Sequence, residues 1–399
     1  MSLIKHARRI PAAAAALISG AIVMAVTALG SVAPAVTLAV VGLTASPGAQ
    51  ALTCSSSNAL RCTSYTENQF AGGFSFSEGY GGFGGASNCS VTHTPVVFIQ
   101  GNADNAASWA ASTYQVSGYN KPAASTYQAF KNAGYKDCEL FGVNYLDSSE
   151  RNSSVAQYNY HKESKYQIIA DFISAVKSYT GASKVDIVSH SMGVTMTIAA
   201  LDYYGEWGSV RRFVNIAGGL HGLDSCLWVG YGNPYAPTCG SQNWYDGWIF
   251  GFYPDSAYPG INPWTADHST WYSLPSAAYE NSGVRFYTID GGTHDEVMCA
   301  TTSDYSTCGN SPLFRSASNV ISQLNVGAGS DTQAVNWDWA NNGYPAYPNV
   351  YGGDSNGVGH FHEKNNTGSI VVEMLTTSCS GIGCASTYQN DNYGPVSAQ

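Results

Sequence analysis

The chain has 399 residues, of which 11% are charged and 44% hydrophobic, and its formal net charge is −10. A disordered chain combines low hydrophobicity with high charge, so this composition excludes that class. A nucleic-acid partner would need a basic surface, and 17 Lys and Arg residues against 27 Asp and Glu residues argue against one. The 43 Gly, 27 Tyr and 9 Trp residues suit contact with a neutral, partly apolar substrate.

Residues 1–51 have the pattern of a secretory signal peptide. A basic start precedes a long apolar stretch without acidic residues, which ends at the A-x-A site Ala49-Gln50-Ala51. An uncleaved membrane anchor is the alternative, since about 20 apolar residues can span a bilayer. Pro34 and the A-x-A site favour cleavage. We therefore expect a secreted, extracellular protein without a permanent membrane anchor.

Ten cysteines follow this segment, and an even number in a secreted chain indicates disulfide bonds. There is no C-x-x-C pair, so a zinc site is not expected. Short loops favour pairing between neighbours in the sequence. The expected pairs are Cys54–Cys62, Cys89–Cys138, Cys226–Cys239, Cys299–Cys308 and Cys379–Cys384.

Strands and helices alternate from residue 94 onward. The apolar patterns predict strands at 95–99, 139–145, 185–190, 210–216 and 284–289, and helices at 122–133, 162–180, 194–204, 313–324 and 368–378. Alternation at this spacing indicates an α/β fold with a mostly parallel central sheet flanked by helices. Two aromatic-rich insertions, at about 218–282 and 325–358, interrupt the pattern and are expected to form a cap. We expect one catalytic domain over residues 52–399.

The pentapeptide Ser189–Gly193 lies where an expected strand passes into an expected helix. A nucleophile elbow occupies this place in α/β-hydrolases and raises a serine hydroxyl above the sheet edge. The positions two residues before and after the serine must be small; Gly193 and Ser189 are small, although Ser189 departs from G-x-S-x-G. We expect Ser191 to be the nucleophile and the Met192 N–H to be one oxyanion donor. An ordinary surface serine is the alternative.

The second oxyanion donor should come from the loop after an earlier strand. The backbone N–H of Asn102, which follows the strand 95–99, is the candidate. The alternative is that Gln100-Gly101-Asn102 is only a strand-ending turn.

The acid and the histidine should follow the serine in the chain. Asp290 and Asp295 compete for the role of the acid, and Asp295 is favoured because its loop can reach back over the sheet. Among the histidines, His360 and His362 follow these acids, and the glycines before His360 suit a tight loop. A metal pair of the two histidines is the alternative, but no third ligand stands out, so no metal or other cofactor is expected. His190 adjoins Ser191, but its side chain is expected to point away from it.

Several stretches of the chain resemble bacterial lipase-type α/β-hydrolases, and most closely the extracellular poly(3-hydroxybutyrate) depolymerases that attack amorphous, native polymer. The stretches are PVVFIQGN at 95–102, QYNYHKESKY at 157–166, SHSMG at 189–193, VRRFVNIAGG at 210–219, APTCGSQNWY at 236–245 and NGVGHF at 356–361. The resemblance extends over nearly all of residues 52–399. It implies the α/β-hydrolase fold and a secreted polyester hydrolase without a separate substrate-binding module.

The same resemblance assigns the catalytic triad to Ser191, Asp295 and His360. One departure is that Gln100-Gly101 stands where lipases usually have His-Gly after the first core strand. The Asn102 donor is a backbone N–H, so it does not depend on the residue at 100. The contacts that hold its loop are expected to differ from those in lipases.

The expected partner is a water-insoluble polyester, and we expect the enzyme to act as a monomer. Tyr160 is expected near the catalytic cleft, and Trp244, Tyr245 and Trp248 on an apolar docking surface away from it. A triacylglycerol lipase or carboxylesterase with the same triad is the first alternative. A non-catalytic polymer-binding protein on the same scaffold is the second.

Overall fold

The computed structural model contains one large sheet whose centre is parallel. It describes residues 51–58, 61–113, 124–223, 225–226, 235–239, 251–252, 283–292, 295, 297–299, 308–314, 316–327, 337–338, 344–345, 359–386 and 396–399. In this part of the chain the sheet has the strand order β13-β10-β9-β8-β7-β5-β6-β4-β3. The strands are β3 (Asn68–Phe70), β4 (Gly82–Gly84), β5 (Val96–Ile99), β6 (Leu140–Val143), β7 (Val185–His190), β8 (Val210–Ile216), β9 (Arg285–Asp290), β10 (Val320–Asn325) and β13 (Ser397–Ala398).

The six strands β6, β5, β7, β8, β9 and β10 run parallel, while β4 pairs with β6 and β13 pairs with β10 in the antiparallel sense. Because β5 is central and the chain crosses to β6 on one side and to β7 on the other, the sheet grows in both directions from β5. Small antiparallel pairs lie outside this sheet: β1 (Ser56–Asn58) with β2 (Arg61–Ser64), and β11 (Trp337–Asp338) with β12 (Tyr344–Pro345). The strand order and parallel centre are those of an α/β-hydrolase.

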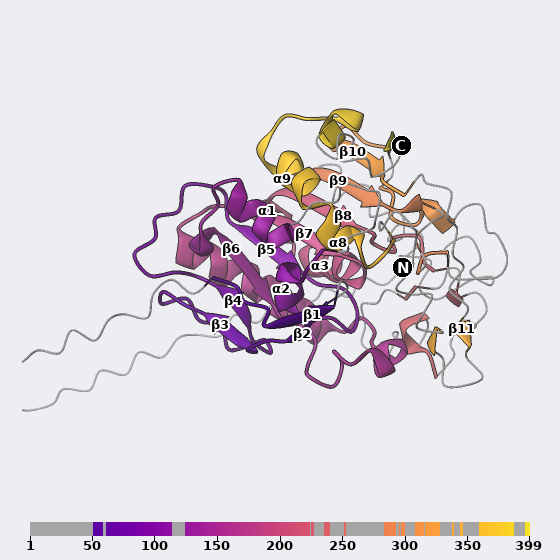
Figure 1. The fold of residues 1–399 in the computed structure, drawn as a ribbon, viewed down its shortest axis with the longest axis horizontal. Coiled ribbons are helices and arrows are strands. Elements are labelled where there is room, and N and C mark those ends of the chain that lie inside the picture. Colours follow the sequence, from indigo (N-terminus) through magenta and orange to yellow (C-terminus); the bar gives the residue numbers. More distant parts are fainter. Residues whose placement is uncertain are drawn as a thin grey trace, which may run out of the picture. The chain divides into compact units, whose positions relative to one another are not determined.

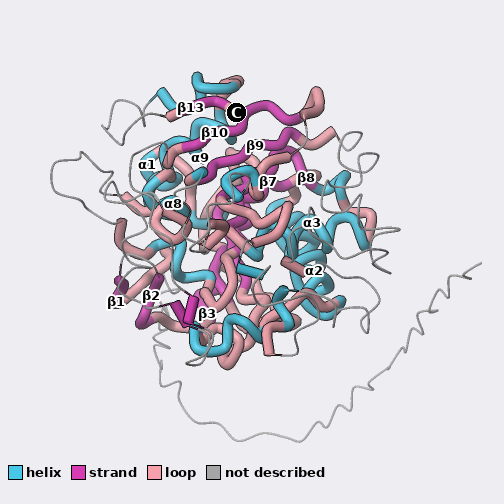
Figure 2. The backbone as a smooth tube through the Cα atoms, turned by 90° about the vertical axis from the view of Figure 1, so that its right-hand side faces the viewer, coloured by secondary structure: helices cyan, strands magenta, loops and turns pink. Residues whose placement is uncertain are grey.

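Helices cover both faces of the sheet (Figures 1 and 2). One face carries α2 (Glu163–Thr180) and α3 (Met192–Tyr203), and the other carries α1 (Thr126–Asn132), α8 (Glu363–Asn366) and α9 (Gly368–Thr376). Strand β5 shows how the two cores arise, because Val97 and Ile99 belong to one buried cluster and Val96 and Phe98 to the other. Alternate residues of a strand point to opposite faces, so a strand buried on both faces is apolar throughout.

The strand and helix predictions are confirmed in the described part of the chain, with one exception. Residues 313–324 were expected to be helical, but Val320–Asn325 form strand β10. The residues of this strand alternate between buried and partly exposed, which is the pattern of a strand near the edge of a sheet. Pairing with β9 on one side and β13 on the other decides the structure, because a short apolar stretch does not distinguish helix from strand by itself.

Disulfide bonds join Cys54 to Cys62, Cys89 to Cys138, Cys226 to Cys239, and Cys379 to Cys384. These are four of the five expected pairs. Cys299 is also disulfide-bonded. Disulfides at this density are typical of proteins that fold in an oxidising compartment.

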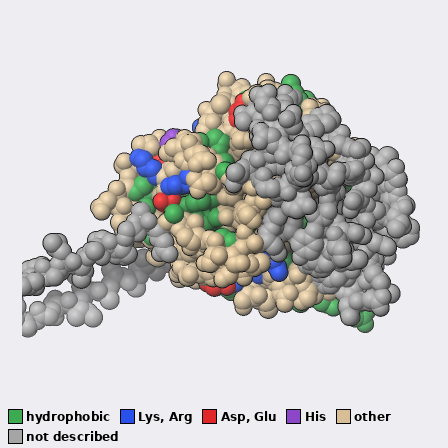
Figure 3. Space-filling view, viewed as in Figure 1, with side chains coloured by type: hydrophobic (Ala, Val, Ile, Leu, Met, Phe, Trp, Pro, Cys, Tyr) green, Lys and Arg blue, Asp and Glu red, His purple; other side chains and the backbone are tan. Residues whose placement is uncertain are grey.

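Two expectations fall mainly outside the described residues: the signal peptide at 1–51, apart from Ala51, and the cap formed by the insertions 218–282 and 325–358. Among the described residues, no helix combines the length and the apolar character that crossing a bilayer requires. On the face shown in Figure 3, uncharged side chains and backbone form most of the described surface, and the charged side chains lie in small groups.

Candidate active site

Ser191 lies in a sharp turn between β7 and α3. Its backbone has φ +53° and ψ −131°, a conformation that non-glycine residues rarely adopt, as expected at a nucleophile elbow. A Cβ atom on Gly193 would lie 2.4 Å from the carbonyl oxygen of Gln100, so only glycine fits there. Ser189 is fully buried and its hydroxyl lies 3.2 Å from that of Thr197. The turn therefore explains why small residues flank Ser191.

His360 lies between Ser191 and Asp295, although these residues are far apart in the sequence. Its Nε2 atom is 2.9 Å from the Ser191 Oγ, and its Nδ1 atom is 2.9 Å from the Asp295 Oδ2. A carboxylate can only accept hydrogen bonds, so Nδ1 carries the proton in the neutral ring and Nε2 accepts the Ser191 hydroxyl. His360 and Asp295 are both 1% exposed. The structure thus brings together the three residues that the sequence proposes as a triad.

Asp295 is held in place by its own loop. Its Oδ1 accepts hydrogen bonds from the backbone N–H groups of Val297 (2.9 Å) and Met298 (2.8 Å), which leaves Oδ2 to face His360. A carboxylate fixed by backbone donors can orient the imidazole ring and stabilise its cationic form.

Asp290, the competing acid, has different surroundings. It is fully buried at the end of β9, where its Oδ1 accepts hydrogen bonds from the Gly292 N–H (2.9 Å) and from the Gln399 side chain (3.2 Å). Burial, with a smaller contribution from the charge of Asp295, raises the pKa of Asp290 to about 7. The structure therefore places Asp295, and not Asp290, against His360.

The two candidate oxyanion donors approach Ser191 from different elements. Met192 is the first residue of α3, and first-turn N–H groups have no acceptor within their own helix. Asn102 lies in the loop after β5, and this loop passes so close to the turn that a Cβ atom on Gly101 would lie 2.8 Å from the Ser191 Cβ. The close approach depends on glycine at 101 and brings the Asn102 backbone toward the nucleophile.

The side chain of Asn102 is anchored away from the nucleophile. Its Nδ2 donates to the carbonyl of Ala156 (2.9 Å), and its Oδ1 accepts a hydrogen bond from the Asn159 side chain (2.7 Å). The loop is also held at Gln100, whose carbonyl accepts a hydrogen bond from the Tyr145 hydroxyl (3.1 Å). The Gln100-Gly101 departure from lipases thus comes with a loop held by the Ala156 carbonyl, the Asn159 side chain and the Tyr145 hydroxyl.

His190 has a contact that the sequence does not predict. The ring is buried next to the turn, and its Nε2 donates to the backbone carbonyl of His360 at 2.7 Å. Burial lowers the pKa of His190 well below its usual value, and the charges of His360 and Lys364 lower it further. The sequence predicts only that this ring points away from the Ser191 side chain. It does not reveal the contact with the His360 carbonyl, because the two residues are 170 positions apart.

Tyr160 is partly buried in the segment that follows β6. The Lys162 Nζ lies 4.6 Å from the centre of its ring. The adjacent His161 is buried and its Nε2 lies 2.9 Å from the Thr195 hydroxyl of α3, so this segment is joined to the helix that begins after Ser191. A substrate role for Tyr160 stays a prediction. Trp244, Tyr245 and Trp248 lie outside the described residues.

In the part of the chain that the structure describes, one group of side chains has the spacing of metal ligands. It consists of Asp295, His360 and Glu363, whose potential ligand atoms all lie within 4.8 Å of one another. Two of these residues already make the hydrogen bonds described above. His362, the partner considered for His360 in a metal pair, is not part of the group.

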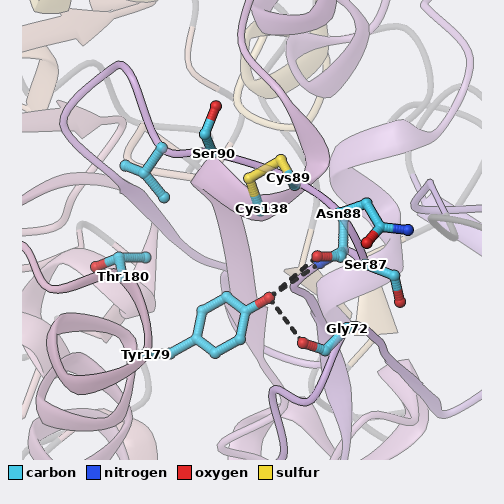
Figure 4. Close-up of a pocket in the computed structure, with 10 residues that line it drawn as sticks. Gly72, Ser87, Asn88, Cys89, Ser90, Cys138, Tyr179 and Thr180 are labelled. Carbon is cyan, nitrogen blue, oxygen red and sulfur yellow. Dashed lines mark hydrogen bonds between the residues drawn. A yellow bond between two sulfur atoms is a disulfide. The ribbon is translucent and has the colours of Figure 1, made fainter.

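An open hollow of about 630 Å³ lies beside the Cys89–Cys138 disulfide (Figure 4). Tyr179 contributes to its wall and donates a hydrogen bond to the Gly72 carbonyl at 3.1 Å. Tyr179 belongs to the end of α2, which precedes β7, whereas Ser191 follows β7. The six residues of β7 separate the two places by about 20 Å, so the hollow is not the substrate cleft.

Residues 93–205 match the family described as Lipase (class 2). This region contains β5, the Asn102 loop and the Ser191 turn. No curated protein sequence matches the chain.

Solved structures with a similar fold include lipases and esterases. Aspergillus fumigatus lipase B is 17% identical, with a TM-score of 0.39, over 72% of this chain and 54% of the lipase. Carboxylesterase CesB from Bacillus subtilis is 12% identical, with a TM-score of 0.33, over 72% of this chain and 85% of that protein. Bacillus licheniformis lipase BlEst2 is 13% identical, with a TM-score of 0.29, over 51% of this chain and 69% of that protein. This chain spans about half the length of the Aspergillus lipase.

Likeness at these identities and TM-scores carries no information about the substrate. The sheet topology and the turn at Ser191 give the chain an α/β-hydrolase fold, and residues 93–205 are similar to the Lipase (class 2) family.

Proposed function

We propose that the protein is a secreted serine hydrolase that cleaves the ester bonds of poly(3-hydroxybutyrate) or a related short-chain polyhydroxyalkanoate. The observation that carries ester hydrolysis is the hydrogen-bonded series from Ser191 through His360 to Asp295, with both distances at 2.9 Å. The general class, a lipase-type carboxylic-ester hydrolase, is supported by the family match over residues 93–205.

The proposed reaction has two stages. In the first, the Ser191 Oγ attacks the ester carbonyl carbon while the His360 Nε2 takes the hydroxyl proton, and the N–H groups of Met192 and Asn102 stabilise the oxyanion. The tetrahedral intermediate collapses, the leaving alkoxide takes the proton from His360, and the acyl group stays on Ser191. In the second stage, water attacks this acyl-enzyme by the same route and releases the carboxylic acid. Asp295 stabilises the cationic ring in both stages.

The choice of polymer rests on the resemblance of several sequence stretches to poly(3-hydroxybutyrate) depolymerases and on a composition low in charge and rich in tyrosine. A neutral polyester offers methyl groups and carbonyls, which bind apolar and aromatic surfaces through burial of apolar area. The disulfides support an extracellular location, where such a polymer would be met. The family match favours a triacylglycerol lipase or carboxylesterase as the second candidate.

Hydrolysis by the purified protein tests the proposal. Product release is measured from amorphous poly(3-hydroxybutyrate), tributyrin and olive oil, for the wild type and for Ser191→Ala. We expect release from the polymer to exceed release from olive oil, and Ser191→Ala to lose at least about 10⁴-fold in kcat. Higher activity on the oil would favour the lipase alternative. Failure of an organophosphonate to label Ser191 would favour the non-catalytic binding protein.

The proposed contacts with polymer are Tyr160 near the cleft and Trp244, Tyr245 and Trp248 on a docking surface. Replacing Trp244 and Tyr245 by alanine should weaken adsorption to polymer particles and leave hydrolysis of a short soluble ester unchanged. Equal loss on both substrates would show that these rings maintain the fold or the cleft instead.

A further inference from the structure

A buried ion pair connects the two segments that carry the proposed chemistry. The Lys364 Nζ lies 2.5 Å from the Asp104 Oδ2, and the two residues are 260 positions apart in the sequence. Asp104 follows Asn102, the proposed oxyanion donor, by two residues, and Lys364 follows His360 by four. The Lys364 side chain is 1% exposed and that of Asp104 is 12% exposed. The pair is therefore shielded from water on both sides.

Neighbouring groups complete the connection. The Lys364 Nζ also donates to the Ser108 Oγ (2.6 Å), and the Ser108 hydroxyl donates to the Asp104 Oδ2 (2.7 Å). The Asn365 Nδ2 donates to the Ser108 carbonyl (2.9 Å), so two consecutive residues of the His360 segment contact the Asn102 loop. The buried Trp109 ring lies 5.7 Å from the Lys364 Nζ. These contacts fix the ammonium group in one place.

Short, constrained segments link the ion pair to the site. Ala103, between Asn102 and Asp104, has φ +53°, which a residue with a side chain adopts only when its surroundings hold it. On the other segment, the N–H groups of His362 and Glu363 both donate to the Gly359 carbonyl at 3.0 Å, which forms a tight turn around His360. A short, constrained segment thus joins each charged side chain to Asn102 or to His360.

Stability by itself gives little reason for a buried ion pair here. Desolvation of two charges offsets most of their attraction, and an apolar pair of similar size is often as stable. Removing one partner, however, leaves a buried charge and displaces its neighbours. A pair located between the Asn102 loop and helix α8, which follows His360, can act by fixing their separation.

We infer that Asp104 and Lys364 are positioning residues for the reaction, because their ion pair holds the Asn102 N–H and the His360 ring at a fixed separation across Ser191. This inference rests on the proposed ester hydrolysis. It assigns neither residue a contact with the substrate. Their effect is therefore on the rate of the acyl-transfer step and not on substrate binding.

Three variants test the inference: Asp104→Asn, Lys364→Met and the double variant. Steady-state kinetics use 4-nitrophenyl butyrate, and a fluorophosphonate reacted to completion counts the intact sites, so that unfolded protein does not lower the measured kcat. Each single variant should lose about 10- to 100-fold in kcat per titrated site, with KM within about threefold, since small displacements of catalytic groups cost this much. The double variant should lose about as much kcat as either single variant, because the loss of one partner already breaks the pair.

Arg211→Met is the matched control. Arg211 and Asp186 form an ion pair at the opposite end of the parallel strands, where β7 and β8 begin, and Asp186 is fully buried. This variant should keep its kcat per titrated site within about twofold while its melting temperature falls. Unchanged kcat per titrated site in all three test variants would overturn the positioning role. A wild type that neither hydrolyses esters nor is labelled at Ser191 would instead contradict the proposed function.

Discussion

Buried carboxylates have different partners at the two ends of the parallel strands, which form the strand-beginning edge and the strand-ending edge. At the edge where the strands begin, Asp186 of β7 binds Arg211 of β8, and the Arg211 guanidinium also donates to the Leu375 carbonyl at the end of α9 (2.9 Å). At the edge where the strands end, Asp104 and Asp295 bind Lys364 and His360 on a distant segment. The first arrangement joins strands and a helix whose packing is set by the sheet. The second joins the Asn102 and Asp295 loops to the segment of His360 and α8, which are not neighbours in the sheet.

From this comparison we expect the charge pair where the strands begin to affect mainly stability, and the pairs where the strands end to affect mainly the proposed catalysis. Backbone register positions neighbouring strands, so the loss of Arg211 leaves β7 and β8 paired. Loops have no such ladder, and their side-chain contacts decide where the functional groups lie. Substitutions of the same kind at the two edges should therefore separate activity from stability.

The largest difference is expected between Asp295→Asn and Asp186→Asn. Both carboxylates are buried and each faces a basic partner. Asp295→Asn should lower kcat on a soluble ester by about 10³- to 10⁴-fold, because an amide no longer holds His360 in the right tautomer or stabilises its cation. Asp186→Asn should leave kcat within a few-fold. Steady-state kinetics on titrated enzyme measure both effects.

A comparable loss of kcat in both Asp→Asn variants would break the comparison, since the loss would then reflect general damage to the sheet. Asp290→Asn adds a further control at the strand-ending edge, because Asp290 lies near Asp295 in the chain but makes its hydrogen bonds with Gly292 and Gln399. It should retain activity within a few-fold. A loss equal to that of Asp295→Asn would make Asp290 the catalytic acid.

A smaller effect is expected from Gly101→Ala. The new Cβ would lie 2.8 Å from the Ser191 Cβ and 2.9 Å from the His190 Nδ1, so the Asn102 loop must move away from the nucleophile. We expect kcat to fall about 10- to 100-fold, with little change in KM, because one oxyanion donor is displaced. Gly208→Ala is the matched change near the strand-beginning edge, where the added Cβ has no neighbour within 4 Å.

Inactivation rates by an organophosphonate give an independent measurement for the two Gly→Ala variants. Gly101→Ala should react more slowly than the wild type, and Gly208→Ala at the wild-type rate. If Gly101→Ala keeps the wild-type kcat, the Asn102 N–H is not an oxyanion donor.

The smallest effect concerns the pH dependence of stability. The pKa of Asp290 is raised to about 7 and that of Asp186 to about 6, in both cases mainly by burial. Between the ordinary value of 3.8 and the raised value, the folded state binds more protons than the unfolded state, so the free energy of unfolding decreases as pH rises. Asp290→Asn should remove this decrease. The change that it causes in the free energy of unfolding should be more stabilising at pH 8 than at pH 4 by about 1–3 kcal/mol.

Urea unfolding at pH 4, 6 and 8 measures these differences. The buried His161 and His190, whose pKa values are lowered by burial, contribute the opposite slope below about pH 6.5, so each variant is compared with the wild type at the same pH. The difference in unfolding free energy between variant and wild type should stop growing near pH 6 for Asp186→Asn and near pH 7 for Asp290→Asn. Parallel stability curves for Asp290→Asn and the wild type would contradict its raised pKa.

Much of the fold could be predicted because its central elements have local patterns. The four buried residues of β5 are apolar throughout, and α2 repeats buried apolar residues at helical spacing up to Gly181, which has φ +71°. Strand β10 could not be predicted in this way, because its pattern is weak and its partners β9 and β13 come from other parts of the chain.

Among the residues at the proposed site, too, those with a local sequence pattern could be predicted and those that depend on distant contacts could not. Ser191 could be predicted from its place between an apolar strand and a helix, and His360 from its order in the chain and the glycines before it. The role of His190 could not, because its partner is a backbone carbonyl, which leaves no trace in the identity of a residue. The Asp104–Lys364 pair was also missed, since a lysine 260 positions away from an aspartate carries no signal of contact.

The sequence by itself determined the central strands and helices from β5 to β9, the sharp turn at Ser191 and the residue types available for acid–base chemistry. These depend on interactions between residues close together in the chain. Only the tertiary structure decided between Asp295 and Asp290, directed His190 to the backbone of His360 and joined Lys364 to Asp104. Those outcomes depend on loops from distant parts of the chain meeting at one edge of the sheet, where burial and hydrogen-bond geometry determine which side chains pair.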